Sequence, residues 1–207
     1  MPLPLISENM QFDKVLKAIE STLAAEAANQ VALGGVGWRT VRERFDPWNV
    51  EVDELNPGVV NVSWSASNFP ESEGTSFEQV SVSTYDVDCY ASEIALAEAG
   101  GITPRDQRAA DVLHALVTRV YHTLMSPIYY DLGLEPGTIA KPWVTSITKF
   151  MPVEANVPVD GVLAARLSYR ILFKEIPPQA EGEPLETINA TTDTEAGGLV
   201  DQMLDVT

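Results

Sequence analysis

Cysteine is almost missing from this sequence, and its single copy, Cys89, excludes a disulfide within the chain. That usage fits a reducing compartment. The first ten residues, MPLPLISENM, have no basic start and no apolar core, so we predict no secretory signal. Long apolar runs are also lacking, which predicts no membrane-spanning helix. Synthesis in the cytoplasm is the expected setting.

Basic residues are scarce as well, because 13 Lys and Arg stand against 30 Asp and Glu, for a net charge of −17. Proteins that bind DNA or RNA through phosphates need clustered Lys and Arg, and this sequence has no such cluster. Specific nucleic-acid recognition is therefore not expected. A surface that repels nucleic acid is compatible with this charge.

The acidic residues are concentrated towards the end of the sequence. Lys174 is the last basic residue, and the segment 175–207 holds eight acidic residues and no basic one. It contains Pro177 and Pro178 but no aromatic residue and no sustained period, so in isolation it is expected to be disordered. We predict one folded domain over residues 1–176 and an extended acidic C-terminal arm over residues 177–207, ordered by neighbouring chains.

Two amphipathic helices are predicted from apolar residues at helical spacing. The first has Ser7 as its candidate cap, runs to about Asn29 and ends at the glycines of 34–37. The second has Thr103 as its N-cap and Pro104 at its first position. Its apolar stripe comprises Ala109, Val112, Leu113, Leu116, Val117, Val120, Tyr121 and Leu124, and its polar side comprises Asp111, His114, Thr118 and His122.

Strands are predicted over residues 38–45, 59–64, 77–91, 143–150 and 161–176. In the last of these, apolar and polar side chains alternate: Leu163, Ala165, Leu167, Tyr169, Ile171 and Phe173 share one face, and Arg166, Ser168, Arg170 and Lys174 share the other. Such alternation is typical of an antiparallel strand with one face on the core. Strands and helices do not alternate strictly, so the predicted fold class is α+β. We expect a mostly antiparallel sheet packed by both helices.

The stretch FEQVSVSTYDVDCYA, residues 77–91, is the strongest candidate for chemistry. Val80 and Val82 occupy even positions, whereas the apolar residues from Tyr85 onwards occupy odd positions. Because successive side chains of a strand point to opposite faces, this change predicts a bulge or a bend near Ser83 and Thr84.

Beyond that bend, Asp86, Asp88 and Tyr90 are predicted to share one face, with Cys89 on the other. Zinc would need His or Cys ligands in reach, and a hard cation would need more oxygen ligands, usually from a loop. No metal site is therefore assigned. The two aspartates are expected to face solvent, a lumen or a neighbouring subunit. A carboxylate-dependent hydrolase using Asp86 and Asp88 is the enzymatic alternative.

No other residue supplies a catalytic group. Cys89, on an apolar face, is expected to be a small buried hydrophobic residue. None of the motifs GxSxG, HExxH or CxxC occurs, so we predict that the protein is not an enzyme and has no cofactor. The outward Arg166, Arg170 and Lys174 are expected to meet acidic groups on a neighbouring copy, or else to be solvated.

The order of these elements resembles that of the tail terminators of tailed bacteriophages, which are also called tail-completion or neck proteins. The similar segments are 85–91 (YDVDCYA), 105–124 and 143–176, which closes with RLSYRILFKEI. Looser agreement covers residues 9–66. The chain is longer than small members of the family, chiefly through the loop 67–79 and the acidic arm.

The resemblance implies an α+β subunit that forms a ring, commonly a hexamer, on the last ring of the tail tube. Such a ring stops tube polymerisation and receives the head connector. The implied partners are further copies, the tail tube protein, the head–tail connector and sheath proteins, while DNA passes through the lumen without specific binding. The implied location is the neck of the virion, with no membrane contact.

Under this resemblance the candidate interface or lumen residues are Asp86, Asp88, Arg166, Arg170 and Lys174. The alternative assignment is another structural part of the virion, such as a head–tail connector, a stopper or a baseplate subunit.

Overall fold

The computed structural model describes residues 10–47, 58–70, 74–75, 78–92, 96–98, 101–103, 105–154, 157–158 and 162–175. All of these belong to one compact unit, Ser7–Pro177. The predicted acidic arm, residues 177–207, lies outside the described residues. Among the described helices, none combines the length and the apolar character that a membrane span requires.

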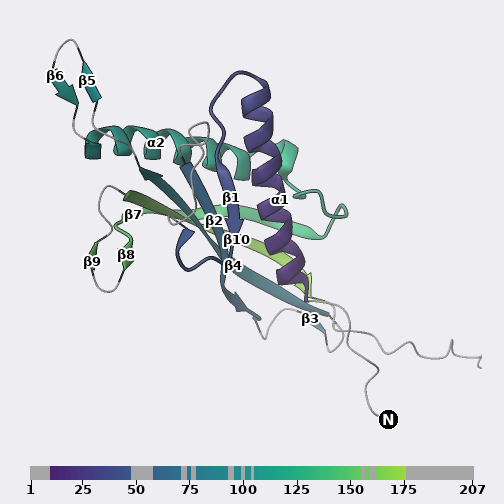
Figure 1. Cartoon of the computed structure of the whole chain (residues 1–207). Coiled ribbons are helices and arrows are strands. Elements are labelled where there is room, and N and C mark those ends of the chain that lie inside the picture. The colour runs from purple at the N-terminus through teal and green to yellow at the C-terminus, as the bar shows by residue number, and fades with distance from the viewer. Residues whose placement is uncertain are drawn as a thin grey trace, which may run out of the picture. The chain divides into compact units, whose positions relative to one another are not determined.

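Two α-helices and a central sheet make up the fold (Figure 1). The helices are α1 (Gln11–Ala32) and α2 (Arg105–Leu124), followed by the short 3₁₀ helix η2 (Pro127–Tyr129). The main sheet contains β1 (Arg39–Arg42), β2 (Gly58–Asn68), β3 (Gly74–Thr75), β4 (Glu78–Ser92), β7 (Ile139–Phe150) and β10 (Val162–Glu175). Two small hairpins pair β5 (Leu96–Glu98) with β6 (Gly101–Thr103), and β8 (Val153–Glu154) with β9 (Val157–Pro158).

The strand order of the main sheet is β1-β2-β4-β10-β7, with β3 paired to one end of β4. The β1–β2 pair is parallel, and the other described pairs of this sheet are antiparallel. The predicted α+β fold with a mostly antiparallel sheet is therefore confirmed. The predicted strand over residues 143–150 is longer than expected, since β7 begins at Ile139 and includes Pro142. Proline weakens a strand signal but is tolerated at a sheet edge, where β7 lies.

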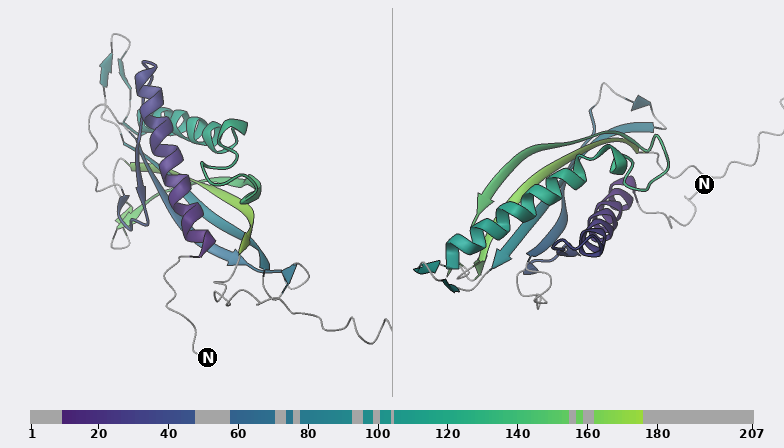
Figure 2. Two further views of the ribbon diagram at one scale, coloured as in Figure 1. Left: turned by 90° about the vertical axis from the view of Figure 1, so that its right-hand side faces the viewer. Right: turned by 90° about the horizontal axis from the view of Figure 1, so that it is seen from above.

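Both helices lie on the same side of the sheet, as the view from above shows (Figure 2). The first helix, α1, packs against β1 and β2, while α2 packs against β4 and β10. The helices contribute buried apolar side chains at intervals of three and four residues, which is the spacing of one helix face. Those side chains are Val15, Leu16, Ile19 and Leu23 of α1, and Ala109, Leu113, Leu116, Val120 and Leu124 of α2.

The sheet supplies its odd-numbered positions on β4 and β10 to this core. On β10, Ala165, Leu167, Tyr169, Ile171 and Phe173 are buried, which confirms the alternation predicted for that strand. The other face of the sheet carries the even-numbered positions of the same strands. No described helix covers that second face.

The predicted reversal of faces within β4 is wrong. The strand runs without a register shift against β10, and Ser81 and Ser83 are buried on the same face as Tyr85. The irregularity lies on the neighbouring strand, where the β2–β4 register shifts between Trp64 and Ala66. Polar serines thus occupy core positions, and hydrogen bonds among Ser67, Ser81 and Ser83 satisfy their hydroxyls.

The N-terminus of α1 is closed by a residue from the other end of the domain. Its N-cap residue, Met10, makes no side-chain cap, and the backbone N–H of Gln11 donates to Oε1 of Glu175 at 2.6 Å. The carboxylate of β10 therefore takes the place of the missing cap. The predicted cap, Ser7, lies outside the described residues. At the other end of α1, Gly34 has φ +80°, which confirms the predicted glycine stop.

Candidate interaction surface

The sheet face that no described helix covers holds most of the residues singled out in the sequence. Antiparallel pairing places Asp88 of β4 opposite Arg166 of β10, and Thr84 opposite Arg170. The pairing of β4 with β10 contains no register shift, so the even-numbered side chains of both strands share this face. We call it the open face.

Arg166 is bound to both aspartates of its own chain. Its Nε and Nη2 donate to the two carboxylate oxygens of Asp88 at 2.7 and 2.8 Å, and its Nη1 lies 3.0 Å from Oδ2 of Asp86. The side chain of Asp88 is 4% exposed, that of Asp86 13%, and that of Arg166 43%. This bidentate pairing fixes the guanidinium in one orientation across the two strands.

Two aromatic rings flank this ion-pair cluster. The hydroxyl of Tyr90 donates to Oδ2 of Asp88 at 3.3 Å, and the ring of Phe150 lies 5.6 Å from Cζ of Arg166. Tyr90 and Phe150 meet edge to face, with centroids 6.0 Å apart. They belong to a small apolar cluster on the open face whose buried members are Val59, Tyr90 and Ala164. The cluster excludes water from one side of the ion pairs, which strengthens them.

The electrostatics of the cluster follow from this burial. Hydrogen bonding to Asp88 raises the pKa of Arg166 further above its usual range, so the guanidinium stays charged. Burial raises the pKa of Asp86, and the neighbouring guanidinium of Arg166 opposes that shift. Burial also raises the pKa of Tyr90, which keeps its hydroxyl protonated as a donor.

These contacts correct the expectation that Asp86 and Asp88 face solvent. Asp88 is buried, Asp86 is largely covered, and their charge is opposed by Arg166 of the same subunit. The sequence pattern placed the acids on the correct face of the strand. It could not show that the two acids and the arginine would become neighbours, because that depends on the register between β4 and β10.

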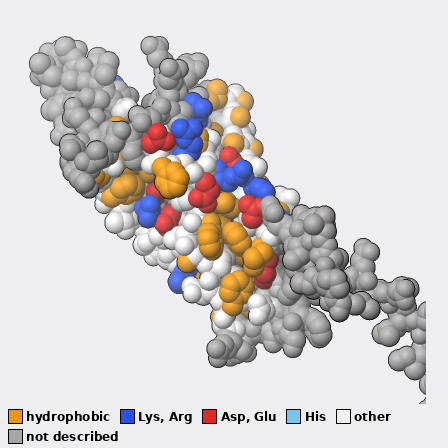
Figure 3. All heavy atoms as spheres, turned by 60° about the horizontal axis from the view of Figure 1, so that its bottom comes forward, with side chains coloured by type: hydrophobic (Ala, Val, Ile, Leu, Met, Phe, Trp, Pro, Cys, Tyr) orange, Lys and Arg blue, Asp and Glu red, His pale blue; other side chains and the backbone are white. Residues whose placement is uncertain are grey.

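Arg170 and Lys174 lie further along the same face and do not join the ion-pair cluster. Nε of Arg170 is 3.4 Å from Oγ1 of Thr84, and Lys174 is exposed opposite Val80. On one face of the molecule, Figure 3 shows hydrophobic, basic and acidic side chains interspersed, with no wide area of a single charge. A mixed surface of this kind is typical of protein contacts rather than of nucleic-acid binding.

Cys89 lies on the core face, as predicted. It is fully buried, and that burial raises the pKa of its thiol well above the usual value. Since the thiolate is the reactive form, this residue is a packing residue and not a nucleophile.

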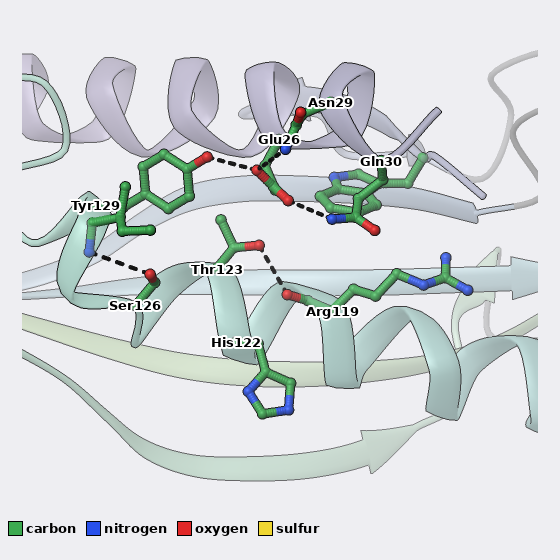
Figure 4. A pocket seen from close by; sticks show the side chains of 10 residues that line it. Glu26, Asn29, Gln30, Arg119, His122, Thr123, Ser126 and Tyr129 are labelled. Carbon is green, nitrogen blue, oxygen red and sulfur yellow. Dashed lines mark hydrogen bonds between the residues drawn. The ribbon is translucent and has the colours of Figure 1, made fainter. Parts of the chain in front are cut away.

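A separate pocket of about 400 Å³ lies between α1 and the end of α2, lined by Glu26, Asn29, Gln30, Trp38, Arg119, His122, Thr123, Ser126, Ile128 and Tyr129. Its centre is Glu26 (Figure 4). The hydroxyl of Tyr129 donates to Glu26 Oε2 at 2.6 Å, and Nε2 of Gln30 donates to Oε1 at 2.6 Å. Asn29 adds a third donor at 3.2 Å.

The pocket offers weak catalytic chemistry. The hydrogen bond from Tyr129 is the main reason that the pKa of Glu26 is lowered, so this carboxylate is a poor general base. His122 points away from Glu26 in Figure 4. Across the described part of the chain, no group of three or more His, Cys, Asp or Glu side chains is arranged to hold a metal ion.

Several residues of the open face were not singled out in the sequence. The pattern of β4 predicts the face of Tyr90, but no pattern in the sequence predicts that Phe150, Lys141 and Trp143 of β7 share that face. Their alternation is interrupted by Pro142 and by a register shift opposite Ser168 and Tyr169. The capping role of Glu175 is not predictable from the sequence, because a cap supplied from a distant strand leaves no local sequence signal.

No protein-family model matches this chain, and a search of curated proteins finds no match.

Proposed function

We propose that this chain is a structural protein of a tailed-bacteriophage virion, a tail terminator that forms a ring in the neck. The ring, of six copies in this proposal, caps the tail tube, stops its polymerisation and joins the tail to the head connector. Its partners are further copies of the chain, the tail tube protein, the connector and sheath proteins. The protein is made in the host cytoplasm and incorporated into the virion.

The observation that carries the proposal is the open face of the sheet. One face is covered by α1 and α2, and the other presents aromatic, apolar and charged side chains without a described helix over it. A sheet covered on one side provides a broad, rigid surface for a neighbouring subunit. The order of elements, with a long strand, a five-turn helix and two closing strands of the main sheet, also agrees with the resemblance found in the sequence.

The charges of the open face bear on how a ring would be built. Asp86 and Asp88 are opposed by Arg166, so this cluster supplies little negative charge to a lumen through which DNA passes. In the proposed ring the open face meets neighbouring subunits, and other acidic residues of a chain with net charge −17 face the lumen. Such a lumen repels DNA and lets it slide.

The test is to measure the mass of the purified full-length protein by light scattering, alone and with isolated tail tubes, and to image the mixture. A ring at one tube end that blocks further tube growth is the expected result. A persistent monomer that ignores the tubes contradicts the proposal. A ring that binds connector or baseplate components but not the tube end favours the alternative position in the virion.

A further inference from the structure

One end of the open face is basic. On β7, Lys141 and Trp143 lie opposite Leu172 and Arg170 of β10, and Nζ of Lys141 is 5.3 Å from the centre of the Trp143 ring. Lys174 lies two residues beyond Leu172 on the same face. We call Lys141, Trp143 and Arg170 the basic end of the open face.

Lys141 and Arg170 have no acid in the neighbouring strand positions of this face, whereas Glu78, the next position of the face beyond Val80 on β4, is diagonal to Lys174. The positions of this face from Val80 to Thr84 on β4, and from Ser168 to Lys174 on β10, hold no Asp or Glu. The nearest aspartate on the face, Asp86, is engaged by Arg166. Within the residues that the structure describes, neither Lys141 nor Arg170 forms an ion pair. The basic end therefore has charge and apolar surface available for a partner.

The chain contains a segment of matching chemistry. Residues 178–207 hold seven acidic residues and no basic one, together with apolar residues such as Leu185 and Leu204. We propose that the basic end of the open face binds this acidic C-terminal segment of a neighbouring copy. The proposal rests on the self-association that forms part of the proposed function, and it does not depend on the position of the protein in a virion.

A neighbouring copy is favoured over the same copy by the sequence at the exit from the sheet. Strand β10 ends at Glu175, close to the basic end, and Pro177-Pro178 follows. Consecutive prolines favour an extended backbone and oppose an immediate reversal of the chain onto its own sheet. At ~3.3 Å per residue, the thirty residues that follow reach up to about 100 Å, which is enough to cross an adjacent subunit.

The chemistry of the contact is that of several weak exposed ion pairs acting together. Carboxylates of the segment pair with Lys141 and Arg170, while Trp143 and Leu172 receive its apolar side chains. Each exposed pair contributes little and is screened by salt. In a closed ring every subunit both gives and receives one segment, so the contacts are formed at high effective concentration.

The experiment uses full-length protein in ¹⁴N- and ¹⁵N-labelled forms, mixed at high salt and then dialysed to low salt. A carbodiimide then joins Lys amines directly to carboxylates that contact them, and mass spectrometry identifies the linked peptides. We expect links from Lys141 to Glu181, Glu183 or other acids of the segment, with one peptide of each isotope. High salt retained throughout should abolish them.

The matched variants are Arg170→Glu and Lys149→Glu. Lys149 is an exposed cation on the same edge strand as Lys141, but its register partner is the core residue Ala165, so it belongs to the opposite face. Arg170→Glu should lower the Lys141 cross-links about fivefold, the factor expected for one exposed ion pair, and Lys149→Glu should leave them unchanged. Circular dichroism confirms that both variants fold, and Arg170→Gln serves as the milder change if Arg170→Glu does not.

Three outcomes overturn the inference: links that join peptides of one isotope only, links from the segment to lysines of other surfaces only, or an equal effect of both variants. Failure of the proposed function looks different. In that case the labelled copies are still cross-linked through the segment, but the assembly does not cap tail tubes.

Discussion

Arg166 and Asp88 are register partners on adjacent antiparallel strands, and two hydrogen bonds of 2.7 and 2.8 Å join the guanidinium to the carboxylate. The relationship is unequal, because the side chain of Asp88 is 4% exposed and that of Arg166 is 43% exposed. The arginine is partly open to solvent and also pairs with Asp86, whereas the aspartate depends on the arginine and on Tyr90.

This inequality predicts that losing the arginine costs more stability than losing the charge of the aspartate. Arg166→Met leaves a buried carboxylate without its cation, and we expect a loss of about 3 kcal/mol in the free energy of unfolding. Asp88→Asn keeps an acceptor oxygen for the guanidinium, and we expect a loss of about 1 to 2 kcal/mol. Urea unfolding followed by circular dichroism measures both.

The double variant Asp88→Asn/Arg166→Met is the control for this pair. Since both partners are removed together, its loss should be smaller than the sum of the single losses. Additive losses, or a larger loss for Asp88→Asn than for Arg166→Met, would show that the pair is not coupled in the way its geometry indicates.

A second prediction concerns the carboxylate that caps α1. Glu175→Ala leaves the backbone N–H of Gln11 without its acceptor, and we expect a loss of about 1 to 2 kcal/mol in the free energy of unfolding. Glu175→Gln retains an oxygen acceptor in the same place and should cost much less. Thermal unfolding of the two variants measures both losses. Equal losses of stability would argue against a capping role.

The fold was largely predictable because its strongest signals are periodic. The six alternating positions of β10 and the apolar stripe of α2 each specify which side is buried, and the structure agrees. Tyr121 is an exception, since it fits the stripe by spacing but is exposed. The apolar residues at helical spacing cover a wider part of the helix surface than the part that contacts the sheet.

The candidate site was less predictable because its contacts depend on the register between β4 and β10. Spacing alone put Asp86 and Asp88 on one face, but it did not reveal that Arg166 of the same chain would face them. Two buried serines on the core face likewise concealed the regular alternation of β4 and suggested a bend that does not exist. In both cases a contact between distant segments overrode a local pattern.

The third prediction tests the thiol of Cys89. Burial raises its pKa, so native protein should react with a thiol reagent at neutral pH only as slowly as it unfolds. Denatured protein should react at once, with one equivalent. Cys89→Ala should be tolerated better than Cys89→Ser, because the buried hydroxyl would need a hydrogen-bond partner. Rapid stoichiometric labelling of the native protein would contradict this assignment.

The last prediction concerns how stability depends on pH. Burial raises the pKa of Glu175 above 4.5 and that of Asp86 above 3.8, so in the acid range the folded state holds protons that the unfolded state has lost. Each group therefore lowers the free energy of unfolding as the pH rises from its pKa in the unfolded state to its raised pKa in the folded state. Above the raised pKa it causes no further change. Glu26, whose pKa is lowered, acts in the opposite direction: its contribution is present above 4.5 and is lost as the pH falls through the lowered pKa.

The measurement is the free energy of unfolding from pH 3 upwards for the wild type, Glu175→Gln and Glu26→Gln, the last serving as the control of opposite sign. As the pH rises, the free energy of unfolding of Glu175→Gln should increase relative to that of the wild type, because the substitution removes the cost of a buried charge. The free energy of unfolding of Glu26→Gln should decrease relative to that of the wild type over the same range, because the substitution removes a carboxylate that the hydrogen bond from Tyr129 stabilises. Parallel curves for the two variants would mean that neither carboxyl has a pKa that differs between the folded and the unfolded state.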